Sequence, residues 1–274
     1  MKLLITGESG YIGGALSSFL KSKKITFYTC TSNSSPKKRI DLCNFKSVQK
    51  KILQVDPDLI VHCASNVPKD QKSYQNKILA NQNVLMMKNL LMASNCPMIF
   101  ISSVTVYGNS IEIIRDEGQC LYPQNEYAKS KVFCEKLLIN DSRKSIILRI
   151  PGVFGGYRKS GIVYNLCHSL KYRKDIALPK EPIEWACIYI NDLVNVIHKT
   201  INLKKYQNLC INIGYKETYS INRLIKLCCD LYQYKVNYNI VHPEFVFNLK
   251  LANNLKLLPS HSLKDVLREF DKSV

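Results

Sequence analysis

Three glycines near the N-terminus constrain the fold of this chain more than any other feature. Gly7, Gly10 and Gly13 directly follow the apolar run Lys2–Thr6, and the residues after Gly10 place apolar side chains on one helical face. A glycine turn between a strand and a helix can hold a dinucleotide pyrophosphate, because it permits a tight turn, a close approach of backbone N–H groups and close helix packing. The segment therefore predicts a dinucleotide-binding unit that starts at residue 2.

Apolar, β-rich runs alternate with helical patterns over the first half of the chain. Strands are expected at residues 2–6, 25–31, 59–63, 97–103 and 145–149. Helices are expected after residue 10 and at residues 44–55, 73–94 and 127–139. Because parallel neighbours need crossover connections, this alternation predicts an α/β fold with a Rossmann-type, doubly wound parallel sheet covered by helices on both faces.

The second half has shorter elements. Helices are expected near residues 161–173, 192–203, 220–231 and 262–270, and brief strands near 186–190 and 209–213. We interpret residues 1–155 as the dinucleotide-binding Rossmann domain and residues 156–274 as a smaller, interleaved substrate-binding lobe. The connections at 31–39 and 107–124 are interpreted as polar loops, the second long enough to be a lid or a binding loop.

Net charge is the unusual feature of the composition. The chain has 39 Lys and Arg against 21 Asp and Glu, a formal charge of +18. Such a surplus suggests a polyanionic partner, which includes nucleic acid, an acidic membrane face or a phosphorylated small molecule; a solvated Lys-rich surface is the alternative. No zinc-finger, helix-turn-helix or basic-aromatic pattern supports nucleic acid, so it is not expected as a partner.

Cysteine usage and hydropathy bear on the compartment. The eleven cysteines are scattered and never spaced as Cys-x-x-Cys, which argues against a zinc site or a disulfide framework and fits a reducing compartment. No stretch approaches the roughly 18 uninterrupted apolar residues of a membrane span, and residues 1–6 show no signal-peptide pattern. We therefore expect a cytoplasmic protein with no metal and no transmembrane segment.

The end of the second expected strand bears on the choice of dinucleotide. An acidic residue there would bind the adenosine ribose of NAD, but residues 28–32 contain none. Lys37, Lys38 and Arg39 follow, so nothing in the loop repels a 2′-phosphate. We therefore favour NADP over NAD, with Ser32 and Arg39 as cofactor-binding candidates. A basic loop that is merely solvated is the alternative.

A tyrosine with a lysine one helical turn later suggests the chemistry. Among sixteen tyrosines only Tyr127 has a lysine at i+4, Lys131, and in a helix the ammonium would favour the phenolate. Tyr127 could then exchange a proton with a substrate oxygen while a nicotinamide exchanges hydride with the attached carbon. Ser103, at the end of the fourth expected strand, could hydrogen-bond the reacting carbonyl; a turn-forming role is the alternative.

Four motifs together resemble the extended short-chain dehydrogenase/reductases of the nucleotide-sugar epimerase, dehydratase and reductase type. In order and spacing, they are Thr6–Gly13, Asn83-Val84, Ser102-Ser103-x-x-Val106-Tyr107-Gly108 and Tyr127-x-x-x-Lys131. The resemblance covers roughly residues 1–200. It implies a Rossmann fold, an NAD(P) cofactor and a nucleotide-sugar substrate, and homodimers formed through the long helices are common among similar proteins.

The resemblance also implies roles for individual positions. Tyr127 resembles the catalytic acid/base, Lys131 the residue that binds the nicotinamide ribose and lowers the phenol pKa, and Ser103 the hydroxyl that orients the carbonyl. Asn83 resembles the helper in the proton path. The other implied cofactor-binding positions are Gly7, Gly10, Tyr11, Ile12 and Gly13 at the pyrophosphate, Asp41 and Leu42 at the adenine, Cys63, Ala64 and Ser65 at the nicotinamide ribose, and Pro151 and Val153 at the carboxamide.

Several positions depart from the family pattern. Val104 and Thr105 stand where nucleotide-sugar dehydratases have an acidic pair, so 4,6-dehydration is not expected. Gly152 and Trp185 stand where many epimerases have an Asn and an Arg that bind the substrate phosphates. The leading interpretation is an NAD(P)-dependent 4-keto reductase of a nucleotide-activated sugar. A 4-epimerase is the alternative, and a catalytically silent NADP-binding regulatory subunit is the alternative from another class.

Overall fold

The chain is built from two units, each assembled from separated segments of the sequence. The computed structural model describes residues 1–30, 40–70, 72–203, 208–272 and 274. Unit 1 comprises residues 1–110, 119–149 and 197–211, and unit 2 comprises residues 111–118, 150–196 and 212–274. The chain enters and leaves each unit more than once, and the predicted division at residue 155 into a dinucleotide-binding domain and an interleaved substrate-binding lobe stays a prediction.

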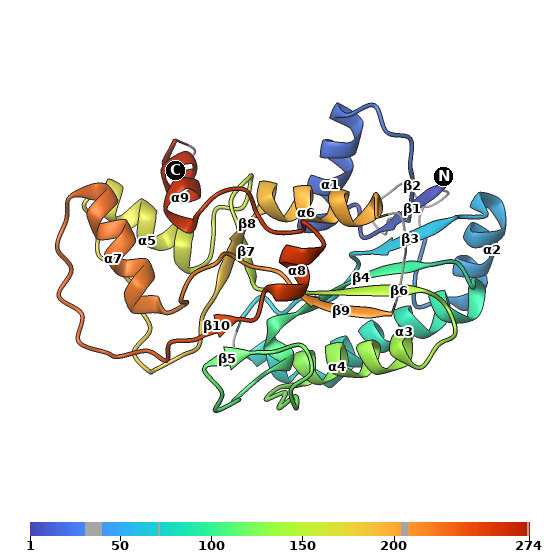
Figure 1. Cartoon of the computed structure of the whole chain (residues 1–274), viewed down its shortest axis with the longest axis horizontal. Helices are drawn as coiled ribbons and strands as arrows, with labels where there is room; N and C mark the ends of the chain where they lie inside the picture. The colour runs from blue at the N-terminus through green and yellow to red at the C-terminus, as the bar shows by residue number, and fades with distance from the viewer. Residues whose placement is uncertain (31–39, 71, 204–207, 273) are drawn as a thin grey trace. The chain divides into compact units, whose positions relative to one another are not determined.

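A six-stranded sheet forms the centre of unit 1 (Figure 1). In spatial order its strands are β2 (Tyr28–Cys30), β1 (Leu3–Thr6), β3 (Leu59–His62), β4 (Met98–Ser103), β6 (Ser145–Ile150) and β9 (Leu209–Asn212). β1 pairs in parallel with β2 and β3, and β3 pairs in parallel with β4. The predicted Rossmann-type parallel sheet is therefore confirmed.

The strand order creates a crossover point beside β1. Because β2 and β3 lie on opposite sides of β1, the chain passes from one side of β1 to the other between these two strands. The carboxyl ends of β1 and β3 adjoin there, since Thr6 pairs with His62. Open α/β sheets bind ligands in the crevice outside such a point.

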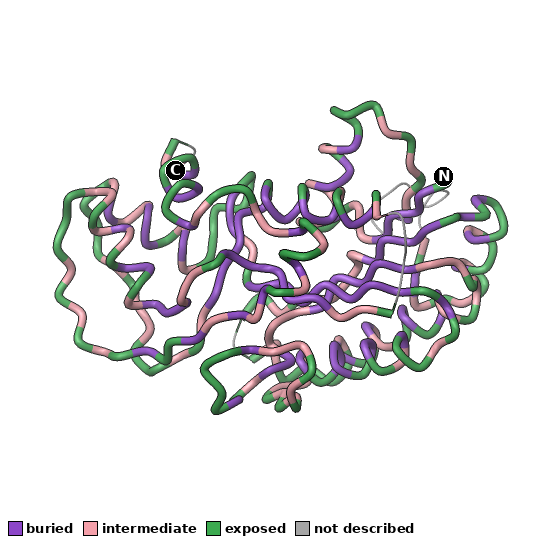
Figure 2. The backbone as a smooth tube through the Cα atoms, viewed as in Figure 1, coloured by how far each residue is buried: buried purple, intermediate pink, exposed green. Residues whose placement is uncertain are grey.

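Helices cover the sheet of unit 1 and supply its core. They are α1 (Tyr11–Ser22), α2 (Phe45–Val55), α3 (Lys77–Ala93) and α4 (Glu126–Ile139). Figure 1 shows α3 and α4 running side by side along one face of the sheet. Their inward residues, such as Met87, Leu90 and Leu138, pack with Leu4, Ile60 and Phe100 of the strands in one hydrophobic cluster. Figure 2 shows the buried strands and the exposed outer helix faces that result.

Two elements begin at least three residues later than predicted. The helix expected at 73–94 begins at Lys77, because the Asn76 side chain caps it by accepting hydrogen bonds from the N–H groups of Ile78 and Leu79. A short 3₁₀ turn, η1 (Lys72–Gln75), precedes this cap. Of the strand expected at 25–31, residues Tyr28–Cys30 form β2 and pair with β1, and residue 31 lies outside the described residues.

Unit 2 holds two small parallel sheets and several helices. The strand pairs are β7 (Gly152–Phe154) with β8 (Cys187–Tyr189), and β5 (Ile114–Arg115) with β10 (Val246–Phe247). Its helices are α5 (Ile162–Lys171), α7 (Ile221–Tyr232), α8 (Lys250–Asn254) and α9 (Leu263–Asp271). A further helix, α6 (Ile190–Ile201), begins in unit 2 and ends in unit 1.

The segment predicted as a polar loop at 107–124 is partly ordered as a strand. Arg115 of β5 is buried, forms an ion pair with Glu184 and places its guanidinium 5.2 Å from the centre of the Phe245 ring. These contacts anchor residues 111–118 within unit 2, so this part of the segment is a component of the fold rather than a free loop.

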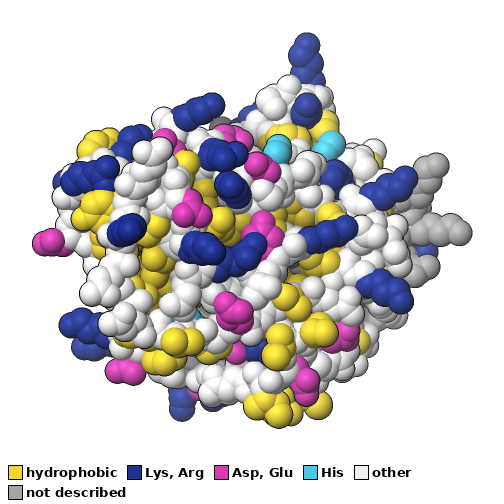
Figure 3. Space-filling view, turned by 60° about the vertical axis from the view of Figure 1, so that its left-hand side comes forward, with side chains coloured by type: hydrophobic (Ala, Val, Ile, Leu, Met, Phe, Trp, Pro, Cys, Tyr) yellow, Lys and Arg dark blue, Asp and Glu magenta, His cyan; other side chains and the backbone are white. Residues whose placement is uncertain are grey.

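Positive and negative side chains are mixed on the face of the molecule that Figure 3 shows. Figure 3 shows Lys and Arg side chains scattered over one face of the molecule, with Asp and Glu side chains among them. This mixed pattern agrees with the solvated-surface interpretation of the +18 charge. Among the described residues, no helix combines the length and the apolar character that crossing a membrane requires.

Candidate functional site

The glycine turn after β1 is a tight cradle of backbone. Gly7 has a φ of +76°, and a Cβ atom there would lie 2.7 Å from the backbone of Ala64. A Cβ at Gly13 would lie 2.2 Å from the Gly7 carbonyl oxygen. Gly10 donates its N–H to that same oxygen at 2.9 Å and caps α1. Only glycine fits the first and last positions, and the turn leads directly into the start of a helix with no acidic residue in its first turn.

A buried hydrogen-bond pair joins the glycine turn to the residues after β3. The Thr6 hydroxyl lies 2.7 Å from His62 Nδ1 and accepts a hydrogen bond from the Ala64 N–H at 3.2 Å. Burial lowers the pKa of His62 to about 3, with a smaller contribution from Lys131, so the ring is neutral. Thr6 therefore holds the ends of β1 and β3 together at the crossover point.

Asn83 of α3 fixes the same segment from its other end. Its side-chain oxygen accepts a hydrogen bond from the Asn66 N–H at 2.7 Å, and its amide nitrogen donates to the Asn66 carbonyl at 3.3 Å. Asn83 is 4% exposed. The structure thus gives Asn83 a positioning contact on the 63–66 segment, and its role in a proton path stays a prediction.

Tyr127 and Lys131 lie on the same face of α4, as their spacing predicts. The Lys131 ammonium is 5.6 Å from the centre of the Tyr127 ring and donates a hydrogen bond to the Ile101 carbonyl of β4 at 3.0 Å. Burial lowers the pKa of Lys131 to about 8. The α4 helix is capped by Asn125, whose side chain accepts from the Ala128 N–H, so Tyr127 lies in its first turn.

The net pKa shift of Tyr127 is opposite to the predicted one. Loss of solvent around the phenol raises its pKa to about 12, although the Ser65 hydroxyl nearby favours ionisation. The ammonium of Lys131 was expected to lower this pKa, but it is directed toward the Ile101 carbonyl and desolvation outweighs it. In this structure the phenol is therefore protonated at neutral pH.

Ser103 ends β4 and caps the turn that follows. Its hydroxyl oxygen accepts hydrogen bonds from the Thr105 N–H at 3.2 Å and from the Thr105 hydroxyl at 3.0 Å, at the start of η2 (Val104–Val106). Both the turn-forming interpretation and the catalytic one fit this geometry, because the proton of Ser103 itself is not used in either bond.

The other predicted cofactor-binding residues lie on several different elements. Leu42 is buried in the hydrophobic cluster, whereas Asp41 is exposed and accepts a hydrogen bond from the Cys43 N–H at 2.9 Å. Tyr11 and Ile12 open α1. Pro151 and Val153 belong to unit 2. Ser32 and Arg39 lie outside the described residues.

Sequence reasoning missed a group of polar side chains next to the predicted site. Ser102, Tyr107, Glu135 and Arg149 are buried and hydrogen-bonded to one another. One sequence signal does point to this group: Glu135 follows Lys131 by four residues, so the two side chains share a face of the helix.

The residues around the crossover point fit a dinucleotide. The glycine turn excludes side chains where a pyrophosphate would approach the backbone. Ser65, at a predicted ribose-binding position, has a buried hydroxyl that lies near the Tyr127 phenol but completes no hydrogen bond of good geometry with another described residue. A buried polar atom of this kind calls for a partner, which a ribose hydroxyl would supply.

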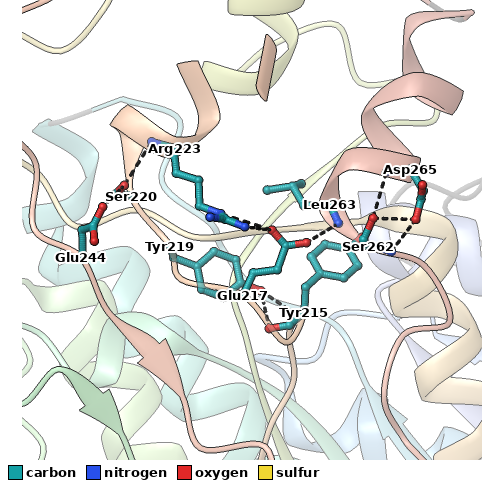
Figure 4. Close-up of polar contacts among 9 residues, drawn as sticks. All are labelled: Tyr215, Glu217, Tyr219, Ser220, Arg223, Glu244, Ser262, Leu263 and Asp265. Atoms are coloured by element: carbon teal, nitrogen blue, oxygen red, sulfur yellow. Dashed lines mark hydrogen bonds and ion pairs between the residues drawn. The ribbon is translucent and has the colours of Figure 1, made fainter. Parts of the chain in front are cut away.

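A separate cluster of polar contacts in unit 2 has a structural role (Figure 4). Glu217 accepts hydrogen bonds from the Leu263 N–H at 2.9 Å and from Arg223 Nη2 at 3.2 Å. Ser262 and Asp265 form a capping box at the start of α9. These contacts join the first turns of α7 and α9, and the Glu217 carboxylate forms its ion pair with Arg223.

A hollow of about 680 Å³ lies beside α7 in unit 2. Its lining includes Lys226, Asp230, Tyr234 and Lys235. None of the predicted site residues contributes to it, so it is distinct from the site in unit 1. Within the described ranges, no three His, Cys, Asp or Glu side chains are grouped so as to hold a metal ion, and the eleven cysteines are free thiols.

The family of the chain follows from a match that spans the sheet and the site. Residues 3–214 match the model of the NAD dependent epimerase/dehydratase family. The chain belongs to this family. Membership confirms the predicted resemblance, and with it the enzyme class of nucleotide-sugar epimerases, dehydrogenases and reductases.

Several known proteins are similar to the chain over different lengths. It is 28% identical to the GDP-6-deoxy-D-talose 4-dehydrogenase of Aggregatibacter actinomycetemcomitans over 241 residues, which cover 84% of this chain and 80% of that protein. It is 25% identical to methionine adenosyltransferase 2 subunit beta of Xenopus laevis over 163 residues, 58% of this chain and 48% of that subunit. The Bordetella bronchiseptica enzyme WbmG, solved with NAD and UDP, has the same fold, with a TM-score of 0.83 at 16% identity, over 98% of this chain and 93% of WbmG.

Proposed function

We propose that this protein is an NAD(P)-dependent reductase that transfers hydride to the 4-keto group of a nucleotide-activated sugar. The observation that carries the proposal is the convergence, within unit 1, of the glycine cradle, the Ser103 hydroxyl and the Tyr127–Lys131 pair around the carboxyl ends of β1, β3 and β4. The relative named as a GDP-6-deoxy-D-talose 4-dehydrogenase supports chemistry at carbon 4.

The protonation state of the site supports reduction as its direction. A phenol with a pKa of about 12 holds its proton at neutral pH, so Tyr127 can donate that proton to a carbonyl oxygen as negative charge develops there. Lys131, with a pKa of about 8, is mainly protonated at neutral pH and stabilises the phenolate that remains. Ser103 has a free proton with which to orient the same oxygen. When bound in this site, NAD(P)H would supply the hydride.

The glycine turn and its neighbours would hold the cofactor. Backbone N–H groups at the start of α1 would bind the pyrophosphate, for which Gly7 and Gly10 leave room by carrying no side chain, and Ser65 and Lys131 would bind the nicotinamide ribose. NADP is favoured over NAD, because residues 28–30 offer no carboxylate for the adenosine ribose and Lys37, Lys38 and Arg39 follow in sequence.

The test is a screen of the purified protein against nucleotide sugars and their 4-keto forms. Absorbance of the reduced cofactor follows reduction, and product analysis detects a redox-neutral 4-epimerisation. Consumption of reduced cofactor with a 4-keto substrate supports the reductase. Interconversion of two sugars without net cofactor change would replace it by the epimerase.

A regulatory subunit without turnover is the second candidate function. The relative named as subunit beta of methionine adenosyltransferase 2 favours it, although the match covers 48% of that subunit. The presence of Ser103, Tyr127 and Lys131 in one site favours an enzyme. Saturable NADPH binding without turnover across the substrate screen would support the subunit instead.

The predicted homodimer has a candidate surface on unit 1. Leu85 and Met92 on α3 and Phe133 on α4 are exposed apolar side chains, and the Lys88 ammonium lies 5.7 Å from the centre of the Phe133 ring, so the two exposed stripes adjoin. A second copy packing its α3 and α4 here would bury these side chains. Sedimentation of the wild-type chain and of Phe133→Glu tests this; a monomeric wild type contradicts it.

A further inference from the structure

Four buried polar side chains form a continuous network beside the proposed site. Arg149 donates from Nη2 to Glu135 Oε2 at 2.8 Å and from Nε to Glu135 Oε1 at 3.2 Å. Its Nη1 donates to the Tyr107 hydroxyl at 3.0 Å, and the Ser102 hydroxyl donates to Glu135 Oε1 at 2.5 Å. All four residues are at most 3% exposed.

Each member of this network is close in the chain to a residue of the proposed site. Ser102 directly precedes Ser103 on β4, and Tyr107 follows the η2 turn that Ser103 caps. Glu135 lies one helical turn after Lys131 on α4. Arg149 reaches both from β6, the strand next to β4 in the sheet. The guanidinium therefore joins the two elements that carry the proton donor and the carbonyl-orienting hydroxyl.

Stability alone does not account for this network. Removing two charges from water is costly, and well-packed apolar residues in place of a buried ion pair are often as stable or more stable. The same core already contains a large hydrophobic cluster formed by α2, α3, α4 and the strands. An Arg–carboxylate pair also fixes orientation, because the planar guanidinium donates its hydrogen bonds only to partners in a narrow range of positions.

We propose that Arg149 and Glu135 are positioning residues that fix α4, and with it Tyr127 and Lys131, against the Ser103 end of β4. The inference rests on the proposed function, because it concerns the same site. In this proposal the buried pair aligns the phenol of Tyr127 with the hydroxyl of Ser103. The network reaches α4 through Glu135 and reaches the Ser103 turn through Ser102 and Tyr107. A displacement of about 1 Å at such a site can lower a rate about 100-fold.

Glu135 also acts on Lys131 through its charge. Burial lowers the pKa of Lys131, and Cys134 and Glu135 on α4, together with Cys63 after β3, oppose that shift. The phenol of Tyr127 also faces the ammonium, and His62 is neutral. Removal of the Glu135 charge should therefore lower the pKa of Lys131 further, so that the ammonium is lost nearer to neutral pH.

The test replaces the pair by apolar residues of similar size, in the double variant Arg149→Met/Glu135→Leu. This variant should stay folded with an unfolding temperature close to that of the wild type, because relief of the desolvation penalty of the ion pair offsets the loss of the Ser102 and Tyr107 hydrogen bonds. Its kcat should fall about 100-fold, with cofactor affinity changed less than about threefold. Arg149→Lys keeps the charge without the fork and should also lose kcat. The matched control is Arg143→Met/Asp141→Leu, which removes another buried arginine and its carboxylate just before β6 and should keep the wild-type kcat.

A second measurement does not depend on turnover. Hydrogen exchange of the amides at 102–108 and 126–131, in protein without substrate, should be faster by about tenfold in the double variant and unchanged in the control. If the wild-type chain turns over no nucleotide sugar, the proposed function fails while the exchange rates still decide the positioning role. A folded double variant with wild-type exchange, or with wild-type kcat in an active enzyme, overturns the positioning role.

A single variant covers the case in which the double variant does not fold. Glu135→Gln preserves the shape of the side chain and removes its charge. It should lower kcat, shift the high-pH limb of the activity profile to lower pH and accelerate exchange at 126–131. An unchanged pH profile together with unchanged exchange overturns the proposal in the same way.

Discussion

Lys131 donates a hydrogen bond from its ammonium to the Ile101 carbonyl at 3.0 Å. This contact joins α4 to β4 two residues before Ser103, and it holds the ammonium 5.6 Å from the centre of the Tyr127 ring. An ammonium has three N–H donors, so the bond to Ile101 leaves donors for a ligand. The lysine is thus both part of the packing of the sheet and part of the proposed site.

Replacement of the phenol tests the proton donor. Tyr127→Phe should lower kcat by about 10²–10⁴-fold, because it removes the proposed proton donor, while NADPH affinity should stay within about threefold. Steady-state kinetics and fluorescence titration measure the two effects. Tyr74→Phe is the control, since it keeps the ring that packs edge-on against Tyr127 at 6.0 Å. Unchanged activity in Tyr127→Phe removes this residue from the mechanism.

Burial of the Lys131 ammonium should lower the free energy of unfolding, and replacement of Lys131 by a neutral residue should raise it again. The pKa of Lys131 falls from 10.5 to about 8 on folding, so below pH 8 both states are protonated and the full penalty applies. Between these values the unfolded chain binds more protons, and the contribution of Lys131 to stability rises with pH. Lys131→Met should therefore raise the unfolding free energy at pH 7 by about 2 kcal/mol after the loss of its hydrogen bond, and by less at pH 9.5.

Urea denaturation at the two pH values measures this difference. Lys129→Met, an exposed lysine on the same helix, is the control and should change stability by less than about 0.5 kcal/mol at either pH. A Lys131→Met variant that is less stable than the wild type at pH 7 contradicts the sign derived from burial.

Gly13→Ala should weaken dinucleotide binding. The added Cβ would lie 2.2 Å from the Gly7 carbonyl oxygen, so either the turn or α1 must move. We expect a loss of about 1–3 kcal/mol of stability and at least a tenfold weaker Kd for NADPH. Gly118→Ala, where the nearest atom is 3.4 Å away, is the control for the loss of a glycine. If calorimetric titration finds that Gly13→Ala binds NADPH with wild-type affinity, the glycine turn is not the binding site of the cofactor.

Thr6→Val should loosen the crossover point. The variant keeps the shape of the side chain but leaves the Ala64 N–H and His62 Nδ1 without their shared partner. A buried group left unsatisfied costs about 1–3 kcal/mol, and the 63–66 segment should bind NADPH less tightly. Thermal unfolding and cofactor titration detect both effects, with the exposed Thr26→Val as control. Equal stability of the two variants would argue against a role for this pair.

NADPH should bind more tightly than NADH. The end of β2 contains no carboxylate, and the following residues of the sequence include Lys37, Lys38 and Arg39. Fluorescence titration with both reduced cofactors compares the affinities directly, and Lys37→Gln/Lys38→Gln should narrow the difference. A clear preference of the wild-type chain for NADH would reverse the assignment.

Sequence patterns predict a structural feature correctly where that feature depends on local geometry or on the period of a helix or strand. The glycine spacing, the apolar strands and the i+4 placement of Lys131 each depend on the geometry of one turn, one strand or one helix, and the structure retains all three. The helical pattern predicts a start for α3 that is too early, because the cap at Asn76 and the 3₁₀ turn before it compete with a continuous helix. The pairing of β5 with β10 was missed because its partners are more than 100 residues apart.

By itself, the sequence determined the fold class, the location of the glycine turn and the identity of the tyrosine–lysine pair, since these follow from the periodicity of backbone structure and the steric demands of glycine. Only the tertiary structure decided the direction of the Tyr127 pKa shift and the partners of Asn83, Glu135 and Arg149. Desolvation and buried hydrogen bonds depend on which distant segments pack together, and a linear pattern does not encode the resulting distances.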